Sequence, residues 1–277
     1  MTFVRINDGV IHYRDEGPRD APAIAFINSL GTDFRVWDEV AAILSGDFRL
    51  VRYDKRGHGL SESGPDRYDM ADYAADLAGL LERLGVVRAT IVGLSIGGLI
   101  AQELYRRRPD FFDALVLSGT AAKVGTDETW DARIAEVERG GIEAIADSIL
   151  TRWFTPDYWA NRADDLAGWR CMLTRSPKQG YIAACGALKR ADLRPHAGAI
   201  ATPTLCLVGD QDGSTPVDLV RETAALIPGA RLEIVTGAGH IPNIERPDAF
   251  AELVARHVRL ARDVQRRRTL NLDSASA

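Results

Sequence analysis

The sequence has few cysteines and no long run of apolar residues. The three cysteines are Cys171, Cys185 and Cys206. An odd number of cysteines without the spacing of metal ligands is typical of reduced thiols rather than of a disulfide framework. No segment reaches the roughly 20 apolar residues of a membrane-spanning helix, and the first residues lack the apolar stretch of a signal peptide. We therefore expect a cytoplasmic protein that does not bind membranes.

Neither sign of charge dominates the chain. Its 277 residues include 34 basic and 39 acidic side chains, for a net charge of −5. This balance provides no general reason to bind nucleic acid. The sequence also lacks a phosphate loop, a dinucleotide fingerprint and a cluster of metal ligands. We expect chemistry that uses side chains alone, with no cofactor and no metal.

Apolar, β-branched segments alternate with helical patterns. Residues 3–8 and 10–17 predict a hairpin around Asn7-Asp8-Gly9, and further strands are predicted at residues 22–29, 48–54, 89–95, 113–120, 202–210 and 230–239. Amphipathic patterns predict helices at residues 70–85, 96–108, 217–229 and from about 247. This alternation predicts an α/β protein with a mainly parallel sheet and helices on both faces.

The strand signals stop between about residues 122 and 195. Four of the five tryptophans lie in this segment: Trp130, Trp153, Trp159 and Trp169. We expect residues 122–195 to form a helical cap inserted into a core made of residues 1–121 and 196–277. Residues 266–277 are expected to be a frayed helix end and a loose tail.

The segment Gly93-Leu94-Ser95-Ile96-Gly97 lies where a predicted strand turns directly into a helix. A serine held between small residues at such a turn is exposed above the sheet, which is the G-x-S-x-G nucleophile elbow. The start of the helix also directs free backbone N–H groups toward the serine. We predict that Ser95 is a nucleophile; the alternative is a capping serine in a glycine-rich turn.

A serine hydroxyl needs a base and an acid partner. His240 follows the last predicted strand in a glycine-rich loop, at the sheet edge where Ser95 also lies, and is the predicted base. The acid should lie between them in chain order, after the strand at 202–210. Asp212 is preferred because it lies further into the turn, and Asp210 remains the alternative.

An oxyanion formed at the serine needs two N–H donors. We predict the backbone N–H of Ile96 and that of Leu30, in the segment "NSLGTD" after the strand at 22–29. The alternative for that segment is an ordinary turn at Gly31. In "YDKRGHG" the glycines and the charges of Asp54 and Arg56 are expected to shape a neighbouring loop, with His58 in a structural role.

These motifs resemble those of the α/β-hydrolase superfamily over nearly the whole chain. Within it the sequence is similar to the 3-oxoadipate enol-lactonases, through "NSLGT", "TAAKVGTDETW", "RWFTPDYW" and "ADLRP". The resemblance implies an eight-stranded, mainly parallel sheet flanked by helices, with an inserted cap. It also implies hydrolysis of a small enol-lactone bearing a carboxylate, giving 3-oxoadipate, by an acyl-enzyme route within the β-ketoadipate pathway.

The substrate carboxylate would need a cation in the cap. Trp130 and Arg133 are three residues apart on a predicted helix and share a face, so they are the preferred substrate contacts. Trp153 is a further candidate, with reserves in Arg152, Lys189 and His196. For Arg133 the alternative is a surface arginine lying over tryptophan.

Two other functions remain open. The chain could be a different esterase or lactonase, acting on acyl-homoserine lactones or aryl esters, or a slow-turnover ligand receptor of the same fold. The expected partner is a small lactone substrate, and the oligomeric state is undetermined.

Overall fold

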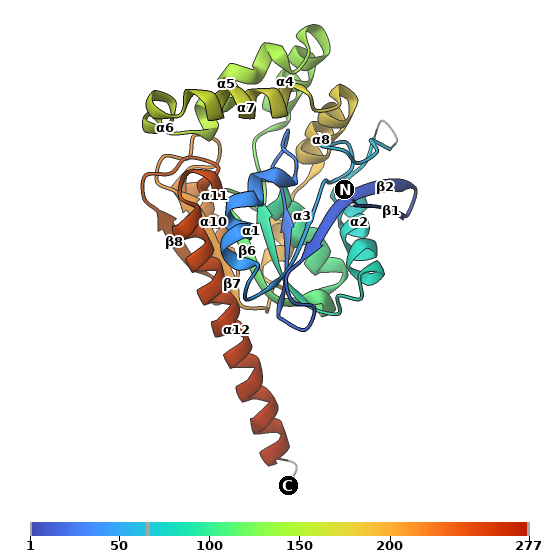
Figure 1. The fold of residues 1–277 in the computed structure, drawn as a ribbon, viewed down its shortest axis with the longest axis vertical. Helices are drawn as coiled ribbons and strands as arrows, with labels where there is room; N and C mark the ends of the chain where they lie inside the picture. Colours follow the sequence, from blue (N-terminus) through green and yellow to red (C-terminus); the bar gives the residue numbers. More distant parts are fainter. Residues whose placement is uncertain (1, 65–66, 276–277) are drawn as a thin grey trace.

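The computed structural model describes residues 2–64 and 67–275, and the strands in these residues form a single sheet (Figure 1). They are β1 (Thr2–Ile6), β2 (Gly9–Glu16), β3 (Ala23–Ile27), β4 (Arg49–Tyr53), β5 (Ala89–Leu94), β6 (Phe112–Ser118), β7 (Thr204–Gly209) and β8 (Arg231–Val235). Their order is β1-β2-β4-β3-β5-β6-β7-β8; β2 is antiparallel to β1 and β4, and the other pairs are parallel. The predicted eight-stranded, mainly parallel sheet is therefore confirmed.

The central strands are buried along their whole length. Every residue of β3, β4, β5 and β7 is buried, whereas the edge strands β1 and β8 are partly exposed. Helices cover both faces of the central strands, so their residues are mostly apolar instead of alternating. This burial explains the continuous apolar runs in the sequence.

The helices lie on both faces of the sheet and beyond the carboxyl ends of its parallel strands. They are η1 (Phe34–Trp37), α1 (Asp38–Leu44), α2 (Met70–Arg83), α3 (Ile96–Arg107), η2 (Pro109–Phe111), α4 (Asp127–Gly140), α5 (Glu143–Trp153), α6 (Pro156–Asn161), α7 (Ala163–Thr174), α8 (Lys178–Arg190), α9 (Arg194–Ala197), α10 (Val217–Leu226), α11 (Pro242–Glu245) and α12 (Pro247–Ala275), where η denotes a 3₁₀ helix. Helices α1 and α12 pack together on one face, and α2 and α3 pack together on the other (Figure 1). No helix in the described part of the chain has the length and apolar character needed to cross a membrane.

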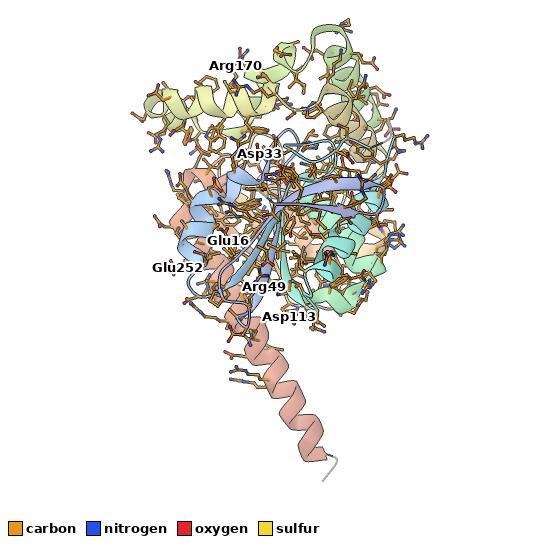
Figure 2. All side chains as sticks on the ribbon, turned by 45° about the vertical axis from the view of Figure 1, so that its right-hand side comes forward. Glu16, Asp33, Arg49, Asp113, Arg170 and Glu252 are labelled. Atoms are coloured by element: carbon orange, nitrogen blue, oxygen red, sulfur yellow. The ribbon has the colours of Figure 1, made fainter. Side chains whose placement is uncertain are left out.

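Helices α4 to α8, between β6 and β7, lie beyond the carboxyl ends of the parallel strands. Figure 2 shows Arg170 of α7 at one end of the molecule, and Arg49 and Asp113 at the opposite end of the sheet. Arg49 begins β4 and Asp113 stands near the start of β6. The carboxyl ends of these strands therefore face the α4–α8 helices, and ligand sites of open parallel sheets form at that edge.

The C-terminal helix is longer than the sequence analysis predicted. Helix α12 continues to Ala275 and extends beyond the body of the molecule (Figure 1). The expected frayed end is thus helical through Ala275, in a segment without glycine or proline. Ser276 and Ala277 lie outside the described residues.

Helix α8 contacts the core through two glycines. The Tyr68 hydroxyl donates to Gly180 O at 3.2 Å. A Cβ on Gly180 would lie 2.4 Å from Gly57 O and 2.5 Å from Gly57 Cα. Helix α8 can approach the loop around Gly57 this closely only because neither residue has a side chain.

We predict that Gly180→Ala destabilises the protein, because an added methyl group cannot fit against the backbone of Gly57. Overpacking of this kind typically lowers the free energy of unfolding by about 1–3 kcal/mol. Gly168→Ala is the matched control, since Gly168 is exposed in α7 with no atom near its Cβ position. It should raise the free energy of unfolding by about 0.5–1 kcal/mol. Urea unfolding of both variants measures the difference, and equal effects would contradict the close contact.

Candidate active site

Ser95 stands at the junction of β5 and α3 in a strained backbone conformation. Its φ of 57° and ψ of −120° are unusual for a residue with a side chain. The backbone is held on both sides: Ser95 N donates to Ser118 O at 2.9 Å, and Ser95 O accepts from Thr120 Oγ1 at 2.7 Å. Ser95 is half-buried while its immediate neighbours are buried. The turn thus presents this one side chain to the space above the sheet.

The flanking glycines make this turn possible. A Cβ on Gly93 would lie 2.3 Å from Gly97 O, and a Cβ on Gly97 would lie 2.3 Å from Ile27 O. Real Cβ atoms do not approach carbonyl oxygens so closely. Helix α3 can therefore start directly against β3 and β5 only with glycine at these positions.

His240 contacts the side chain of Asp212. Its Nδ1 lies 2.9 Å from Asp212 Oδ2 and 3.0 Å from Oδ1. Both residues are buried, and His240 follows β8 in the loop that leads to α11. Since Nδ1 faces the carboxylate, the Nε2 of His240 is the nitrogen free for another partner.

The Asp212 carboxylate is held by the turn in which it lies. Oδ1 accepts from Ser214 N at 2.7 Å and Thr215 N at 2.8 Å, and Oδ2 accepts from Thr215 Oγ1 at 2.7 Å. Burial alone would raise the pKa of Asp212, but the charge of His240 and the hydrogen bonds from His240 and Thr215 lower it below its ordinary value. Asp212 is therefore an anion at neutral pH, oriented toward the imidazole.

Asp210 has a different set of contacts. Its Oδ1 accepts from Gly237 N at 2.8 Å and Ala238 N at 3.3 Å, so it ties the turn after β7 to the loop after β8. His58 is fully buried, where burial and the charge of Lys55 lower its pKa. His12 pairs with Asp54 at 2.8 Å.

A cavity of about 230 Å³ lies between the sheet edge and the α4–α8 helices, and both Ser95 and His240 line it. This volume is below the roughly 300–1,000 Å³ of pockets that hold drug-sized ligands, so it suits a smaller molecule. In the described residues, no three His, Cys, Asp or Glu side chains are grouped as a metal site. The other lining residues are Ser29, Leu30, Val124, Gly125, Thr129, Trp130, Arg133, Ile149, Arg152, Trp153, Tyr181, Leu188, Gly213, Ser214 and Thr215.

The loop after β3 brings Leu30 to this cavity. The Ser29 carbonyl beside it accepts from Lys55 Nζ at 2.6 Å and from Thr32 Oγ1 at 2.9 Å. Lys55 is fully buried, and burial lowers its pKa well below the ordinary value. Ile96, the other predicted oxyanion donor, is the first residue of α3, where backbone N–H groups have no intrahelical acceptor.

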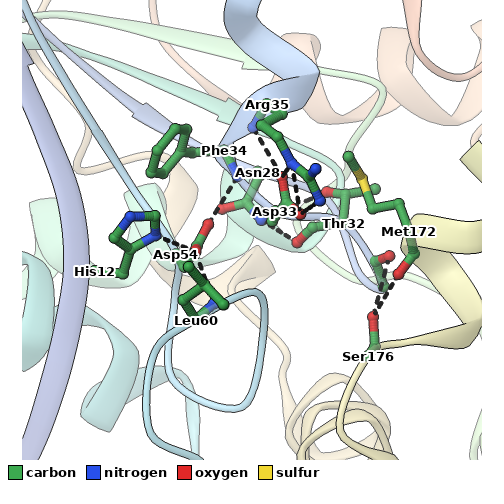
Figure 3. A network of polar contacts seen from close by, with 11 residues as sticks. His12, Asn28, Thr32, Asp33, Phe34, Arg35, Asp54, Leu60, Met172 and Ser176 are labelled. Carbon is green, nitrogen blue, oxygen red and sulfur yellow. Dashed lines mark hydrogen bonds and ion pairs between the residues drawn. The ribbon is translucent and has the colours of Figure 1, made fainter. Parts of the chain in front are cut away.

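Asp54 fixes the chain that follows this loop (Figure 3). Its carboxylate accepts from Phe34 N at 2.8 Å and Leu60 N at 2.9 Å, and it also contacts His12. Burial raises the pKa of Asp54, and the hydrogen bonds from Leu60, His12 and Phe34 oppose that rise. On the other side of the loop, Ser176 Oγ lies 3.4 Å from Gly31 O (Figure 3). The loop is therefore fixed from the core and from the segment between α7 and α8.

The structure separates the candidate substrate contacts into two groups. Trp130, Arg133, Arg152 and Trp153 all line the cavity, and Arg133 lies over the Trp130 ring with its Cζ 5.0 Å from the centroid. The reserve candidate Lys189 instead pairs with Asp131 at 2.6 Å. The other reserve, His196, lines a separate hollow beside Gln102, Tyr105 and Ile200.

The sequence analysis missed Glu245, which fastens the end of α5 to the His240 loop. Its carboxylate accepts from Thr155 N at 3.0 Å, Thr155 Oγ1 at 2.7 Å and Gly239 N at 2.5 Å. In the same region His240 N donates to Trp153 O at 2.8 Å. The only available sequence signal was an acidic residue five positions after His240.

Comparison with known proteins agrees with this architecture. The family model described as alpha/beta hydrolase family matches residues 24–253. The chain is 34% identical to 3-oxoadipate enol-lactonase 2 of Acinetobacter baylyi over 247 residues, covering 89% of this chain and 92% of the relative. It is 33% identical to a pimeloyl-[acyl-carrier protein] methyl ester esterase of Chromobacterium violaceum, covering 86% of this chain and 94% of that one.

A solved structure gives the same result. The enol-lactonase of Burkholderia xenovorans LB400 superposes with a TM-score of 0.90 at 39% identity, covering 93% of this chain and 99% of that one. The sheet, the inserted helices and the match over most of the sequence lead to one assignment. This chain is a hydrolase that belongs to the alpha/beta hydrolase family, and its sequence and structure are similar to those of enol-lactonases.

Proposed function

We propose that this protein hydrolyses 3-oxoadipate enol-lactone to 3-oxoadipate, in the β-ketoadipate pathway of aromatic compound catabolism. The main support is that the cavity lined by Ser95 and His240 is also lined by two arginines, Arg133 and Arg152. Among the described side chains no ion pair joins either arginine to an acid, whereas Arg170 and Lys189 are paired. A lactone that carries a carboxylate supplies the missing charge. The similarity to enol-lactonases supports the same substrate.

In the proposed reaction Ser95 attacks the lactone carbonyl. His240 takes the serine proton through Nε2, while Asp212 on Nδ1 holds the imidazole in the required tautomer and stabilises its cation. The oxyanion of the tetrahedral intermediate accepts hydrogen bonds from the N–H groups of Leu30 and Ile96.

Collapse of this intermediate breaks the ring C–O bond. The leaving oxygen is an enolate, which is a better leaving group than an alkoxide, and it becomes a ketone on protonation. Because the ester is cyclic, both halves stay attached to Ser95 as one acyl chain. Water, deprotonated by His240, then attacks the acyl carbon and releases the diacid with a free Ser95 hydroxyl.

Arg133 is the proposed contact for the carboxylate of the substrate. Its planar guanidinium can donate two parallel hydrogen bonds to a carboxylate, and the adjacent Trp130 ring limits its movement. Trp130 and Trp153 supply apolar walls to the same cavity.

We predict that Ser95→Ala folds normally and loses nearly all hydrolysis. The glycines, not the hydroxyl, allow the sharp turn, so only the nucleophile is removed. Removing a triad member typically lowers kcat by roughly 10⁴- to 10⁶-fold. Steady-state kinetics with circular dichroism test this, with Ser45→Ala, at the end of α1, as a control that keeps activity. More than a tenth of wild-type activity in Ser95→Ala would rule out the serine mechanism.

A second prediction distinguishes the two aspartates. Asp212→Asn should lower kcat by about 10⁴-fold, because an amide favours the wrong histidine tautomer. Asp210→Asn should cost much less, because the asparagine oxygen can still accept from Gly237 and Ala238. Measuring kcat for the two variants shows which substitution costs more. A larger loss in Asp210→Asn would identify Asp210 as the acid.

A third prediction concerns the contact between Arg133 and the carboxylate of the proposed substrate. Arg133→Ala should lower kcat/KM for the enol-lactone by roughly 30- to 5,000-fold, since losing one member of a desolvated ion pair costs about 2–5 kcal/mol. Arg133→Lys should recover only part, because an ammonium lacks the planar fork. Hydrolysis of a neutral aryl ester should change little. Equal losses on both substrates would show that Arg133 supports the fold.

The same substrates test the proposed function against its alternatives. Wild-type kcat/KM should be far higher for the enol-lactone than for neutral esters or acyl-homoserine lactones. A preference for a neutral substrate would indicate a different esterase or lactonase. Tight binding of the enol-lactone without turnover would indicate a receptor.

A further inference from the structure

Arg152 lies at the catalytic end of the cavity. A Cβ on Gly213 would lie 3.2 Å from Arg152 Cα, so the end of α5 packs directly on the turn that carries Asp212. The next residue, Trp153, accepts the hydrogen bond from His240 N at 2.8 Å. Arg133, by contrast, lies on α4 beside Trp130. The two arginines therefore line one cavity from different elements.

Most hydrogen-bond donors of Arg152 remain available to a ligand. Its Nε donates to Ser148 O at 3.2 Å, on the preceding turn of its own helix. A guanidinium has five N–H groups, and no ion pair joins Arg152 to an acid among the described side chains. Burial, and then the positive charge of Arg133, lower the pKa of Arg152. The charge of Glu136 opposes this fall, but no acid forms an ion pair with Arg152 among the described side chains, so its guanidinium can still pair with an anionic ligand.

The proposed reaction turns a monoanionic substrate into a dianionic product, and two cations match that product better than one. The enol-lactone has one carboxylate, which occupies one guanidinium. Hydrolysis of the acyl-enzyme creates a second carboxylate at Ser95, beside His240 and the Asp212 turn. The product is a dianion, so its charge equals that of the two arginines.

We propose that Arg152 is a second carboxylate subsite and that the cavity binds dicarboxylates, with Arg133 and Arg152 each contacting one carboxylate. This deepens the proposed function, on which it rests for the identity of the diacid. Dicarboxylates of the product's length then bind to the free enzyme more tightly than monocarboxylates of the same length.

Adipate and hexanoate are suitable probes, because they have the same number of carbons and differ by one carboxylate. Their inhibition constants are measured against hydrolysis of a neutral aryl ester, so the assay does not depend on the enol-lactone. Adipate should compete with the ester and bind at least tenfold more tightly than hexanoate. Arg152→Gln should weaken the binding of adipate by roughly 10- to 100-fold, which is the usual effect of losing a charge-assisted hydrogen bond. It should weaken the binding of hexanoate much less.

Two further variants control the experiment. Arg152→Lys keeps the charge and should restore part of the preference for adipate. Arg139→Ala removes one positive charge from an exposed position on α4 and should leave the adipate-to-hexanoate ratio unchanged. If Arg152→Gln is too slow to assay, calorimetry of both ligands in a Ser95→Ala background, with and without Arg152→Gln, measures the same ratio.

The outcomes separate this inference from the proposed function. If Arg152→Gln leaves the ratio of the adipate and hexanoate inhibition constants unchanged, even where both ligands bind more weakly, the second subsite is overturned. A wild-type enzyme that hydrolyses the enol-lactone without preferring adipate retains the proposed function and loses the subsite. A wild-type enzyme that prefers adipate through Arg152 but does not hydrolyse the enol-lactone retains the subsite and loses the proposed substrate.

Discussion

The close approach of helix α3 to strands β3 and β5 is the constraint on which the candidate site depends. Gly97 lies against the backbone of Ile27, and Gly93 lies against that of Gly97, with no room for a Cβ at either position. The chain must therefore reverse direction within one residue, and Ser95 takes the positive φ that this requires. Such strain persists only where the surrounding structure fixes it, as the hydrogen bonds to Ser118 and Thr120 do here. The same geometry points the first N–H groups of α3 toward the space above Ser95.

The inserted helices are joined to the catalytic edge by buried hydrogen bonds. Glu245 links Thr155 to Gly239, and the carbonyl of Trp153 holds the backbone of His240. Because Trp153 follows Arg152 directly, the segment that positions the histidine also carries one of the two cavity cations. The proposed substrate contact Arg152 and the carbonyl that places His240 therefore belong to a single backbone segment. A shift of α5 relative to the sheet would alter both.

Sequence reasoning succeeded where local chemistry determines the structure. Continuous apolar runs indicated the buried strands, and the glycines around Ser95 indicated the turn. It preferred Asp212 but kept Asp210 as an alternative, because both follow β7 within three positions and only the path of the turn separates them. It preferred Arg133 among the cap cations but could not separate the reserves Arg152 and Lys189. Lys189 is neutralised by Asp131 from another helix, whereas Arg152 has no such partner among the described side chains, and neither fact is visible in one helical pattern.

Arg133 and Arg152, which form no ion pair among the described side chains, bear on the proposed specificity of the cavity. Two guanidinium groups that share a partly desolvated space lose hydration and repel each other, which disfavours the empty site. Under the proposed function, a carboxylate ligand would remove part of both costs, so an anionic substrate would gain binding energy that a neutral ester cannot. In the proposed reaction the Ser95 proton passes to His240, so the oxyanion and the imidazolium form together and the net charge of the cavity stays the same. The backbone N–H groups beside the oxyanion and Asp212 beside the imidazolium each act on a charge that is present in the transition state and absent from the substrate, and that difference is what accelerates a reaction.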